Sequence, residues 1–471
     1  MLILNKIIKE KILNTTYTAK NLLIFSIGVL TSLFAIFLMH YNHIAFDYMG
    51  DSGGYIHPAL GLFYLGKLGW FEKGEYVQQV MRLPVYPWFI FIAYKFFGPN
   101  NNLAVVIAQA FIMGGITLLT SKTAKIINSK YEWFAVILIG LCPNLFFRAS
   151  LILPDLLFTF LILCGIYFFI FSLSKNFLKN LILSSIFFGL AFLTRPALIL
   201  YPLFTFPFLI LLIKNKKKLT THKAFLYAFL HISLMATIIA PQIVYEKIYT
   251  GEFMLTTQGG DHALFWVYPC LKHSWGGKLN IETLNNVRKI YNDRVSKLPK
   301  EQQSNLALLA NIQKKLFIEK IAEMPKLQLL KGIIGSSLKM LFYTSMLGIS
   351  EGFHHYIPHI SLYNPKLDIS ELTSNFGQFF IFVSEIILFL LRGIQLIGFF
   401  YGIYNKHYRA ITLYLFMGML SFVTVSVGIG NPRFRAPIEP ILIIFTVFGV
   451  LAIKKVRLFG WSYQDKLVFN K

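Results

Sequence analysis

Charged residues are scarce in this chain. Only 14% of its 471 residues are charged, whereas 56% are hydrophobic, and the mean hydropathy is +0.60. Soluble domains typically contain about 25% charged residues, so the composition excludes an ordinary water-soluble enzyme. One membrane span needs about 20 apolar residues, and the chain is many times longer than that. We therefore expect an all-α polytopic membrane protein.

Cysteines and several familiar motifs are also scarce or absent. The three cysteines, Cys142, Cys164 and Cys270, form no metal-type pair, which implies no disulfide framework. The sequence has no Gly-Lys-Ser/Thr phosphate loop, no dinucleotide glycine fingerprint and no HExxH helix. These absences argue against an ATP-driven pump and a zincin-type membrane protease. No internal repeat stands out, which argues against a repeat-built transporter.

Acidic residues are outnumbered by basic ones, 21 against 45, and the net charge is +24. In a soluble protein this excess would suggest nucleic-acid binding. In a membrane protein it fits lysines and arginines in cytoplasmic loops beside anionic headgroups. We therefore expect membrane lipids, and no nucleic acid, among the partners.

Ten apolar runs give the expected topology. They lie near 22–41, 102–121, 133–150, 155–173, 178–194, 197–213, 223–245, 376–400, 410–428 and 436–453. Lysines and arginines gather in alternate connections, so the positive-inside rule places both termini in the cytoplasm. The first run has no small-residue cleavage site and is expected to be a retained helix. Two broken apolar pieces, Pro84–Phe97 and Leu327–Leu347, are expected to be interfacial or re-entrant helices on the outer face.

This topology predicts three parts. Residues 1–245 form a transmembrane module with a first outer loop at about 42–101, residues 246–375 a large outer loop with helices, and residues 376–471 the last spans. No targeting tail is evident, so we expect a bacterial inner membrane with the outer loops in the periplasm. The endoplasmic reticulum would give the same sidedness.

The first outer loop contains a candidate catalytic carboxylate, Asp51. It follows the first span and precedes Gly53 and Gly54, which allow a tight turn before a short helix. A partly desolvated carboxylate at this junction can act as a general base. The alternative is that Asp51 only caps the helix that begins near Gly53.

Several arginines stand in outer turns, where the positive-inside rule predicts few. They are Arg82, Arg148, Arg195, Arg433 and Arg435. Each needs a partner. One possibility is a carboxylate, for example Asp155 for Arg148. The other is that several converge on a phosphate, whose oxygens match the guanidinium fork.

The second outer loop offers weaker candidates. Gly259, Gly260, Asp261 and His262 form a stretch that can contact an acceptor or a metal, or be an ordinary turn. A histidine cluster at 354–359 suggests a metal site, but Pro358 breaks its spacing, and a structural role is the preferred interpretation.

Five short segments follow one another along the chain: Asp51-Ser52-x-x-Tyr55 with Ala59, Arg82-x-Pro84-x-Tyr86-Pro87, Leu151–Phe158 with Asp155, Gly189–Pro196, and Arg433-Phe434-Arg435-x-Pro437. In this order they resemble the GT-C membrane glycosyltransferases, nearest to protein O-mannosyltransferases and lipid A aminoarabinose transferases, in which Glu is more usual at the position of Asp155. The resemblance covers residues 20–215 well and the last two spans moderately, while 246–375 match nothing known to us.

The resemblance implies a GT-C-like bundle of about ten spans and a hexosyl or pentosyl transferase. A polyprenyl-phosphate sugar would be the donor, and a lipid, glycan or protein the acceptor. Asp51 would be the base of an inverting reaction, and Asp155 would help to place the acceptor or a metal. Arg82, Arg195, Arg433 and Arg435 would bind the donor phosphate, with Arg195 possible as a structural residue instead.

Other details stay open at this stage. Relatives often have Asp-Glu where this chain has Asp51-Ser52, so no cofactor is certain, and a divalent metal ion is only possible. Asp47 could substitute for the missing acid only if the loop folds back, and Tyr55 is a further site candidate. The competing functions are a flippase or carrier for lipid-linked saccharides, and a polymerase or ligase that transfers longer chains. A carrier should have ionisable residues near the membrane midplane, and the apolar runs are nearly bare of them.

Overall fold

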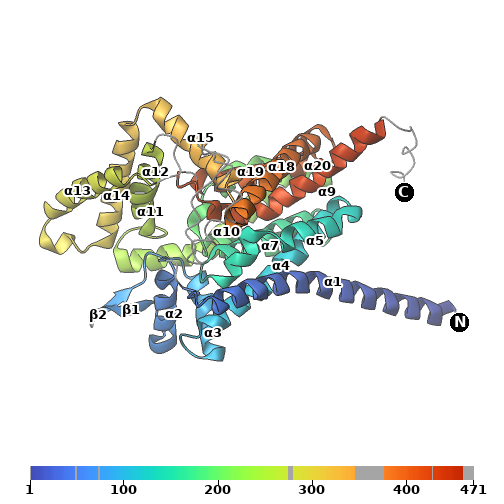
Figure 1. Ribbon diagram of the computed structural model, residues 1–471, viewed down its shortest axis with the longest axis horizontal. Coiled ribbons are helices and arrows are strands. Elements are labelled where there is room, and N and C mark those ends of the chain that lie inside the picture. The colour runs from blue at the N-terminus through green and yellow to red at the C-terminus, as the bar shows by residue number, and fades with distance from the viewer. Residues whose placement is uncertain are drawn as a thin grey trace.

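The computed structural model describes residues 2–47, 50–72, 75–273, 279–344, 376–426 and 428–459. In Figure 1, the N-terminal end of α1 and the C-terminal end of α20 point toward the same end of the molecule. The helices α11–α14 and the small β-hairpin lie at the opposite end, and a bundle of long helices connects the two.

In the part of the chain that the structure describes, seven helices are long and apolar enough to cross a membrane. They belong to α1 (Leu2–Tyr41), α4 (Asn102–Ile127), α7 (Asp155–Ser172), α10 (Thr221–Thr250), α18 (Phe376–Tyr404), α19 (Arg409–Ser426) and α20 (Glu439–Phe459). A further apolar pair consists of η1 (Ser129–Tyr131) with α5 (Glu132–Gly140), bent by 53° against α6 (Pro143–Phe146) with η2 (Phe147–Ser150), which is the geometry of a broken span or of a re-entrant loop. The bend lies just before Pro143, which has no N–H to donate and disfavours a helical residue before it.

Two shorter helices occupy the remaining predicted runs. They are α8 (Phe177–Phe192) and α9 (Tyr201–Lys217), the latter preceded by η3 (Pro196–Leu198). Each of the ten apolar runs is therefore helical in the structure, and the predicted all-α polytopic bundle is confirmed. The division into three domains is still a prediction, although α10 continues to Thr250, beyond the boundary expected at 245.

Glycines let the helices pack closely at two contacts in the bundle. A Cβ on Gly398 of α18 would lie 1.9 Å from the carbonyl oxygen of Phe445, and one on Gly449 of α20 would lie 2.1 Å from that of Ile394. In α1, a Cβ on Gly28 would lie 2.7 Å from the Met113 carbonyl oxygen of α4. Small residues at such contacts are typical of helix pairs in membranes.

The segment predicted to be the first outer loop, called the first outer segment below, folds into two helices and a hairpin. These are α2 (Gly53–Leu65), β1 (Gly69–Glu72), β2 (Glu75–Gln78) and α3 (Val85–Phe97). The hairpin is antiparallel, with Trp70 opposite Val77, and the sequence analysis did not predict it. The 13 residues of α3 are too few to cross a membrane.

The second outer segment forms a helical layer with its own core. Its elements are α11 (Gln258–His262), η4 (Ala263–Val267), α12 (Tyr268–Lys272), α13 (Ile281–Ser296), η5 (Lys300–Gln302), α14 (Leu306–Ala322) and α15 (Lys326–Phe342). Leu264, Leu271 and Leu316 are buried between them. The backbone N–H of Thr257 donates to the Val80 carbonyl at 3.0 Å, which joins this layer to the first outer segment. The predicted histidine cluster at 354–359 lies outside the described residues.

Candidate active site

The Asp51 carboxylate is held by two arginines from distant parts of the chain. Its Oδ1 accepts a hydrogen bond from Arg82 Nη2 at 2.9 Å, and its Oδ2 accepts one from Arg433 Nη1 at 2.9 Å. The N-cap of α2 is Ser52, and the Asp51 side chain does not cap that helix. The structure therefore contradicts the capping alternative. The Asp51 side chain is 44% exposed, so its carboxylate is accessible to solvent.

Asp155 is the buried counterpart of Asp51. It is the first residue of α7, and its side chain is fully buried. Its Oδ1 accepts a hydrogen bond from Arg195 Nη1, and its Oδ2 accepts one from Arg433 Nε at 3.0 Å. A buried carboxylate needs such partners, because an unpaired charge in this environment is very costly.

Arg433 links the two carboxylates. Its guanidinium donates to Asp155 through Nε and to Asp51 through Nη1. The residue lies in η6 (Pro432–Ile438), whose start is fixed because Asn431 Oδ1 accepts from the Arg433 backbone N–H at 2.8 Å. The planar fork of arginine suits this bridging geometry, which lysine cannot reproduce.

Arg195 reaches the cluster from a short break between two helices. It is extended, with φ −148° and ψ 134°, between the end of α8 and Pro196 at the start of η3. Its guanidinium carbon lies 5.2 Å from the ring centre of Phe434 and 5.9 Å from that of Phe158. Cation–π contacts at these distances help to hold a partly buried guanidinium.

A cavity of about 610 Å³ adjoins this cluster. Arg82, Arg195 and His262 supply polar groups to its lining. Much of the remaining wall is apolar and comes from the outer helical layer, with Phe317 and Ile321 of α14 and Leu329 and Ile333 of α15. Asp51 does not line the cavity itself, but it pairs with Arg82, which does. Cations at one place and an apolar wall beside them are the features expected of a site for a lipid-linked anion.

Electrostatics in the outer segments follow from these contacts. Burial alone would raise the pKa of the Asp51 carboxyl, but the guanidinium groups of Arg433 and Arg82 hold it below its ordinary value of 3.8. Burial raises the pKa of Asp261 above 3.8, and Arg82 only partly opposes this shift. Burial, together with Arg195, lowers the pKa of His262 to about 4, so its imidazole is neutral at pH 7.

The other predicted site residues lie around or away from this cluster. Tyr55 accepts a hydrogen bond from Arg82 Nη1 at 3.4 Å and lines the cavity. Asp47 accepts one from Asn102 Nδ2 at 3.2 Å, at the start of α4. His262 lines the cavity, and Asp261 is its neighbour in α11.

Arg435 and Arg433 contact different partners. It pairs with Glu439 and donates through Nη1 to the carbonyl oxygens of Met340 and Tyr343, both at 2.8 Å. In a 3₁₀ helix with three residues per turn, side chains two positions apart point in different directions. Two arginines in one short motif therefore serve different parts of the protein.

Metal binding finds little support in this arrangement. Both carboxylates, Asp51 and Asp155, are already paired with guanidinium groups. Within the described ranges, no group of three His, Cys, Asp or Glu side chains could hold a metal ion. The described residues supply no ligand set for a divalent cation, and the reaction proposed below is derived without one.

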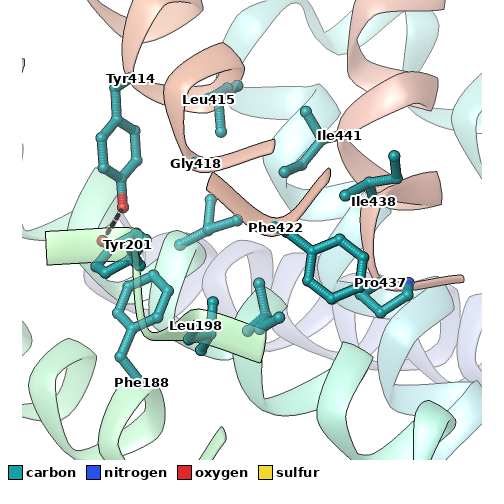
Figure 2. Close-up of a pocket in the computed structure, with 12 residues that line it drawn as sticks. Phe188, Leu198, Tyr201, Tyr414, Leu415, Gly418, Phe422, Pro437, Ile438 and Ile441 are labelled. Carbon is teal, nitrogen blue, oxygen red and sulfur yellow. Dashed lines mark hydrogen bonds between the residues drawn. The ribbon is translucent and has the colours of Figure 1, made fainter. Parts of the chain in front are cut away.

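A much smaller cavity lies inside the helix bundle. Figure 2 shows its aromatic and aliphatic lining, with the hydroxyls of Tyr201 and Tyr414 hydrogen-bonded at 3.0 Å beside it. Its volume of about 20 Å³ is close to the space of a single water molecule. This cavity is a packing gap and is too small for a sugar or a lipid.

Comparison with known proteins agrees with the fold. Residues 82–245 match the family model of dolichyl-phosphate-mannose-protein mannosyltransferases. The apo oligosaccharyltransferase of Archaeoglobus fulgidus superposes with a TM-score of 0.52 at 13% sequence identity, covering 93% of this chain and 51% of that one. The chain has the GT-C fold. The resemblance predicted from the motifs is thus confirmed, and the chain spans about half the length of the archaeal enzyme.

A second solved protein has a lower similarity. ArnT from Cupriavidus metallidurans gives a TM-score of 0.40 at 11% identity in the apo state, and 0.38 at 13% when bound to undecaprenyl phosphate. Each comparison covers 93% of this chain and 78% of ArnT. No curated protein sequence matches the chain significantly.

The matched segment contains three members of the cluster. Arg82, Asp155 and Arg195 lie within residues 82–245, whereas Asp51 and Arg433 lie outside. The sequence analysis missed the apolar wall from α14 and α15. The one feature of the sequence that pointed to this wall was the apolar piece near 327–347, and that piece did not indicate which surface it would cover.

Proposed function

We propose that this protein is a membrane glycosyltransferase that moves a sugar from a polyprenyl-phosphate donor to a hydroxyl or amine of a lipid, glycan or protein. The proposal rests on the cavity of about 610 Å³, which combines Arg82 and Arg195 with an apolar wall. The partly exposed Asp51 carboxylate is paired with Arg82 at this cavity. The arginines would hold the donor phosphate and the wall would cover the isoprenoid chain. The acceptor would approach from the exposed side of Asp51.

The proposed reaction is a single displacement at the anomeric carbon. The acceptor oxygen or nitrogen forms a bond to this carbon while the bond to the phosphate oxygen breaks, and the configuration inverts. Asp51 takes the acceptor proton, and the lipid phosphate leaves with the bonding electron pair. Fixed arginines stabilise the charge that develops on this leaving group, an effect worth a few kcal/mol per donor in other enzymes.

The ion pairs of Asp51 suggest how donor binding and base strength are connected. With Arg82 and Arg433 both bonded to it, Asp51 has a lowered pKa and is a weak base. A donor phosphate that draws these guanidinium groups toward its own oxygens would raise the pKa of Asp51. The base would then become active only when the donor is in place.

Asp155 has a different role in this proposal. Its carboxylate is fully buried and bonded by Arg195 and Arg433, so it cannot reach an acceptor. It would orient these two arginines for the phosphate. We also propose that the active site faces the periplasm of a bacterial inner membrane, since the lysine-rich connections belong on the cytoplasmic side.

A carrier of lipid-linked saccharides is the second candidate. One observation favours it, because Arg392 lies within the apolar helix α18 and is only 8% exposed. The Asp51 cluster, however, lies at the outer-segment end of the bundle, where a transferase needs it and a carrier does not.

The test uses the purified chain with a set of polyprenyl-phosphate sugars and candidate acceptors, with products identified by mass spectrometry. Asp51→Asn should lower the rate by roughly 10²–10⁴-fold at an unchanged protein level, the range typical of a lost general base. Arg433→Ala should weaken donor binding more than acceptor binding. Asp293→Asn, an exposed change in α13, is the matched control and should keep the wild-type rate.

Two results would count against the proposal. Full activity of Asp51→Asn would remove Asp51 as the base. Transport of a lipid-linked sugar across vesicles, without any transfer product for the whole donor set, would favour the carrier.

A further inference from the structure

A second cavity of about 330 Å³ lies apart from the Asp51 cluster. It is lined by α5 and α6 on one side and by α18 and α20 on the other. Most lining side chains are aliphatic, including Ile137, Leu141, Ile387 and Ile443. The proposed transferase reaction uses none of them.

Charged groups nevertheless meet in this cavity. Arg392, Arg435 and Glu439 all line it, so two guanidinium groups face one carboxylate. Glu439 accepts from Arg435 Nε at 2.5 Å, whereas its nearest approach to Arg392 is 3.8 Å. Glu385 is buried about two turns before Arg392 in α18, and it is not part of the lining. Among the described residues that line the cavity, cations therefore outnumber anions.

Arg392 lies well inside a membrane-spanning helix. It is ten residues from the start of the span Phe382–Tyr404, a distance of about 15 Å along a helix. Charged side chains inside spans are costly, and they usually mark a functional site. A role in packing alone would be served better by an aliphatic residue of similar volume.

Within the described ranges, two buried polar atoms in the lining have no hydrogen-bond partner. Arg392 donates through Nε to the Leu341 carbonyl at 2.9 Å and through Nη1 to Gln395, but its Nη2, which lies 3.8 Å from Glu439 Oε2, has no hydrogen-bond acceptor there. Asn144 donates through Nδ2 to Glu439 Oε1 at 3.3 Å, but its Oδ1 has no donor. The two residues are only 8% and 1% exposed. Buried polar groups are nearly always hydrogen-bonded, so these two atoms can take a ligand or an ordered water.

The cavity is bordered by side chains that can contact lipid. Ile137, Leu141 and Ile387 line it and are 55%, 60% and 53% exposed on apolar helices. Lipid chains can therefore lie along this surface with a headgroup in the cavity.

We propose that this cavity binds the phosphate headgroup of a membrane glycerophospholipid. Arg392 Nη2 donates to a phosphate oxygen, and Asn144 Oδ1 accepts from a headgroup hydroxyl or ammonium. The need for a donor as well as an anion favours a glycerophospholipid over a polyprenyl monophosphate, whose headgroup has no alcohol or amine and is mostly the dianion, without a P–O–H donor, at pH 7. The acyl chains contact Ile137, Leu141 and Ile387. The proposal does not depend on the transferase reaction.

The experiment titrates the purified full-length chain in detergent micelles with phosphatidylglycerol and counts bound lipids by native mass spectrometry. Wild type should hold one lipid saturably. Arg392→Gln should weaken that binding by about tenfold or more, because a charge-assisted hydrogen bond is lost. Arg409→Gln removes an exposed arginine at the start of α19 and is the matched control, with wild-type binding expected.

A second variant covers the case in which Arg392→Gln does not fold. Ile387→Trp adds bulk at the lipid-exposed mouth, leaves Arg392 in place, and should also reduce binding. Diacylglycerol and undecaprenyl phosphate serve as comparison lipids. The proposal is overturned if both variants bind phosphatidylglycerol as wild type does or if diacylglycerol binds equally well. It is also overturned if undecaprenyl phosphate binds more tightly in an Arg392-dependent manner.

Discussion

The two ion pairs of Arg433 offer a sharp test, because they share one guanidinium and differ mainly in burial. The Arg433 bonds to Asp155 and Asp51 are 3.0 Å and 2.9 Å long. The Asp155 side chain is fully buried, whereas that of Asp51 is 44% exposed. If length decided their strength, the two pairs would contribute equally to stability. If burial decides it, they should differ severalfold.

The perturbation is a pair of double-mutant cycles, one with Arg433→Gln and Asp155→Asn, the other with Arg433→Gln and Asp51→Asn. Close buried charge pairs show coupling energies of a few kcal/mol, so we expect about 2–4 kcal/mol for Asp155. Water screens the more exposed pair, for which we expect about 0.5–1 kcal/mol. Both aspartate changes keep the side-chain size, so cavity effects should be small.

The assay is equilibrium unfolding in mixed micelles, as the anionic detergent fraction rises, followed by circular dichroism. A cycle with Arg195→Gln and Asp155→Asn is the positive control, because that ion pair is also buried. Equal coupling energies for Asp51 and Asp155, or a larger one for Asp51, would refute the reasoning. That result would mean that burial does not distinguish a carboxylate that orients arginines, as proposed for Asp155, from one that takes part in the reaction, as proposed for Asp51.

Two further predictions concern other parts of the fold. His262 has a folded pKa of about 4 against an ordinary 6.5, so the unfolded chain binds its proton first and stability should fall as pH drops from 6.5 to 4. The loss should reach about 2 kcal/mol, allowing for partial exposure of the ring, and should disappear from pH-dependent unfolding curves of His262→Gln. Gly398→Ala should destabilise the contact between α18 and α20 by about 1–3 kcal/mol, because the new methyl group overlaps the Phe445 carbonyl. The same unfolding assay measures it, and Gly393→Ala, where a Cβ meets nothing within 4 Å, is its control.

Much of the helix bundle could be predicted because lipid imposes a simple rule. Apolar runs must form helices that satisfy their own backbone hydrogen bonds, and each of the ten predicted runs is helical. The hairpin around Trp70 and Val77 was missed, since its two strands have only four residues each. Such short strands carry little periodic signal.

The cluster around Asp51 could be predicted only in outline. Charge placement indicated that acidic and basic residues share one side of the membrane, but not which arginine meets which carboxylate. Arg433 and Arg435 were assigned together, yet the 3₁₀ geometry of η6 sends them to different partners. Arg392 was overlooked because one arginine hardly changes the hydropathy of the run at 376–400. Such a residue is noticed only when the structure places it beside Glu439 and Arg435.

Both cavities have an arginine surplus next to η6, and that surplus is the common physical argument for anions. Around Asp51 and Asp155, three guanidinium groups, Arg82, Arg195 and Arg433, meet two carboxylates. On the other side, Arg392 and Arg435 meet Glu439. Counted over the described residues that form these ion pairs, each group has one more cation than anions, and a low dielectric makes an excess cation costly. A phosphate in each cavity would remove this cost. The position of η6 would then depend on whether each cavity is occupied.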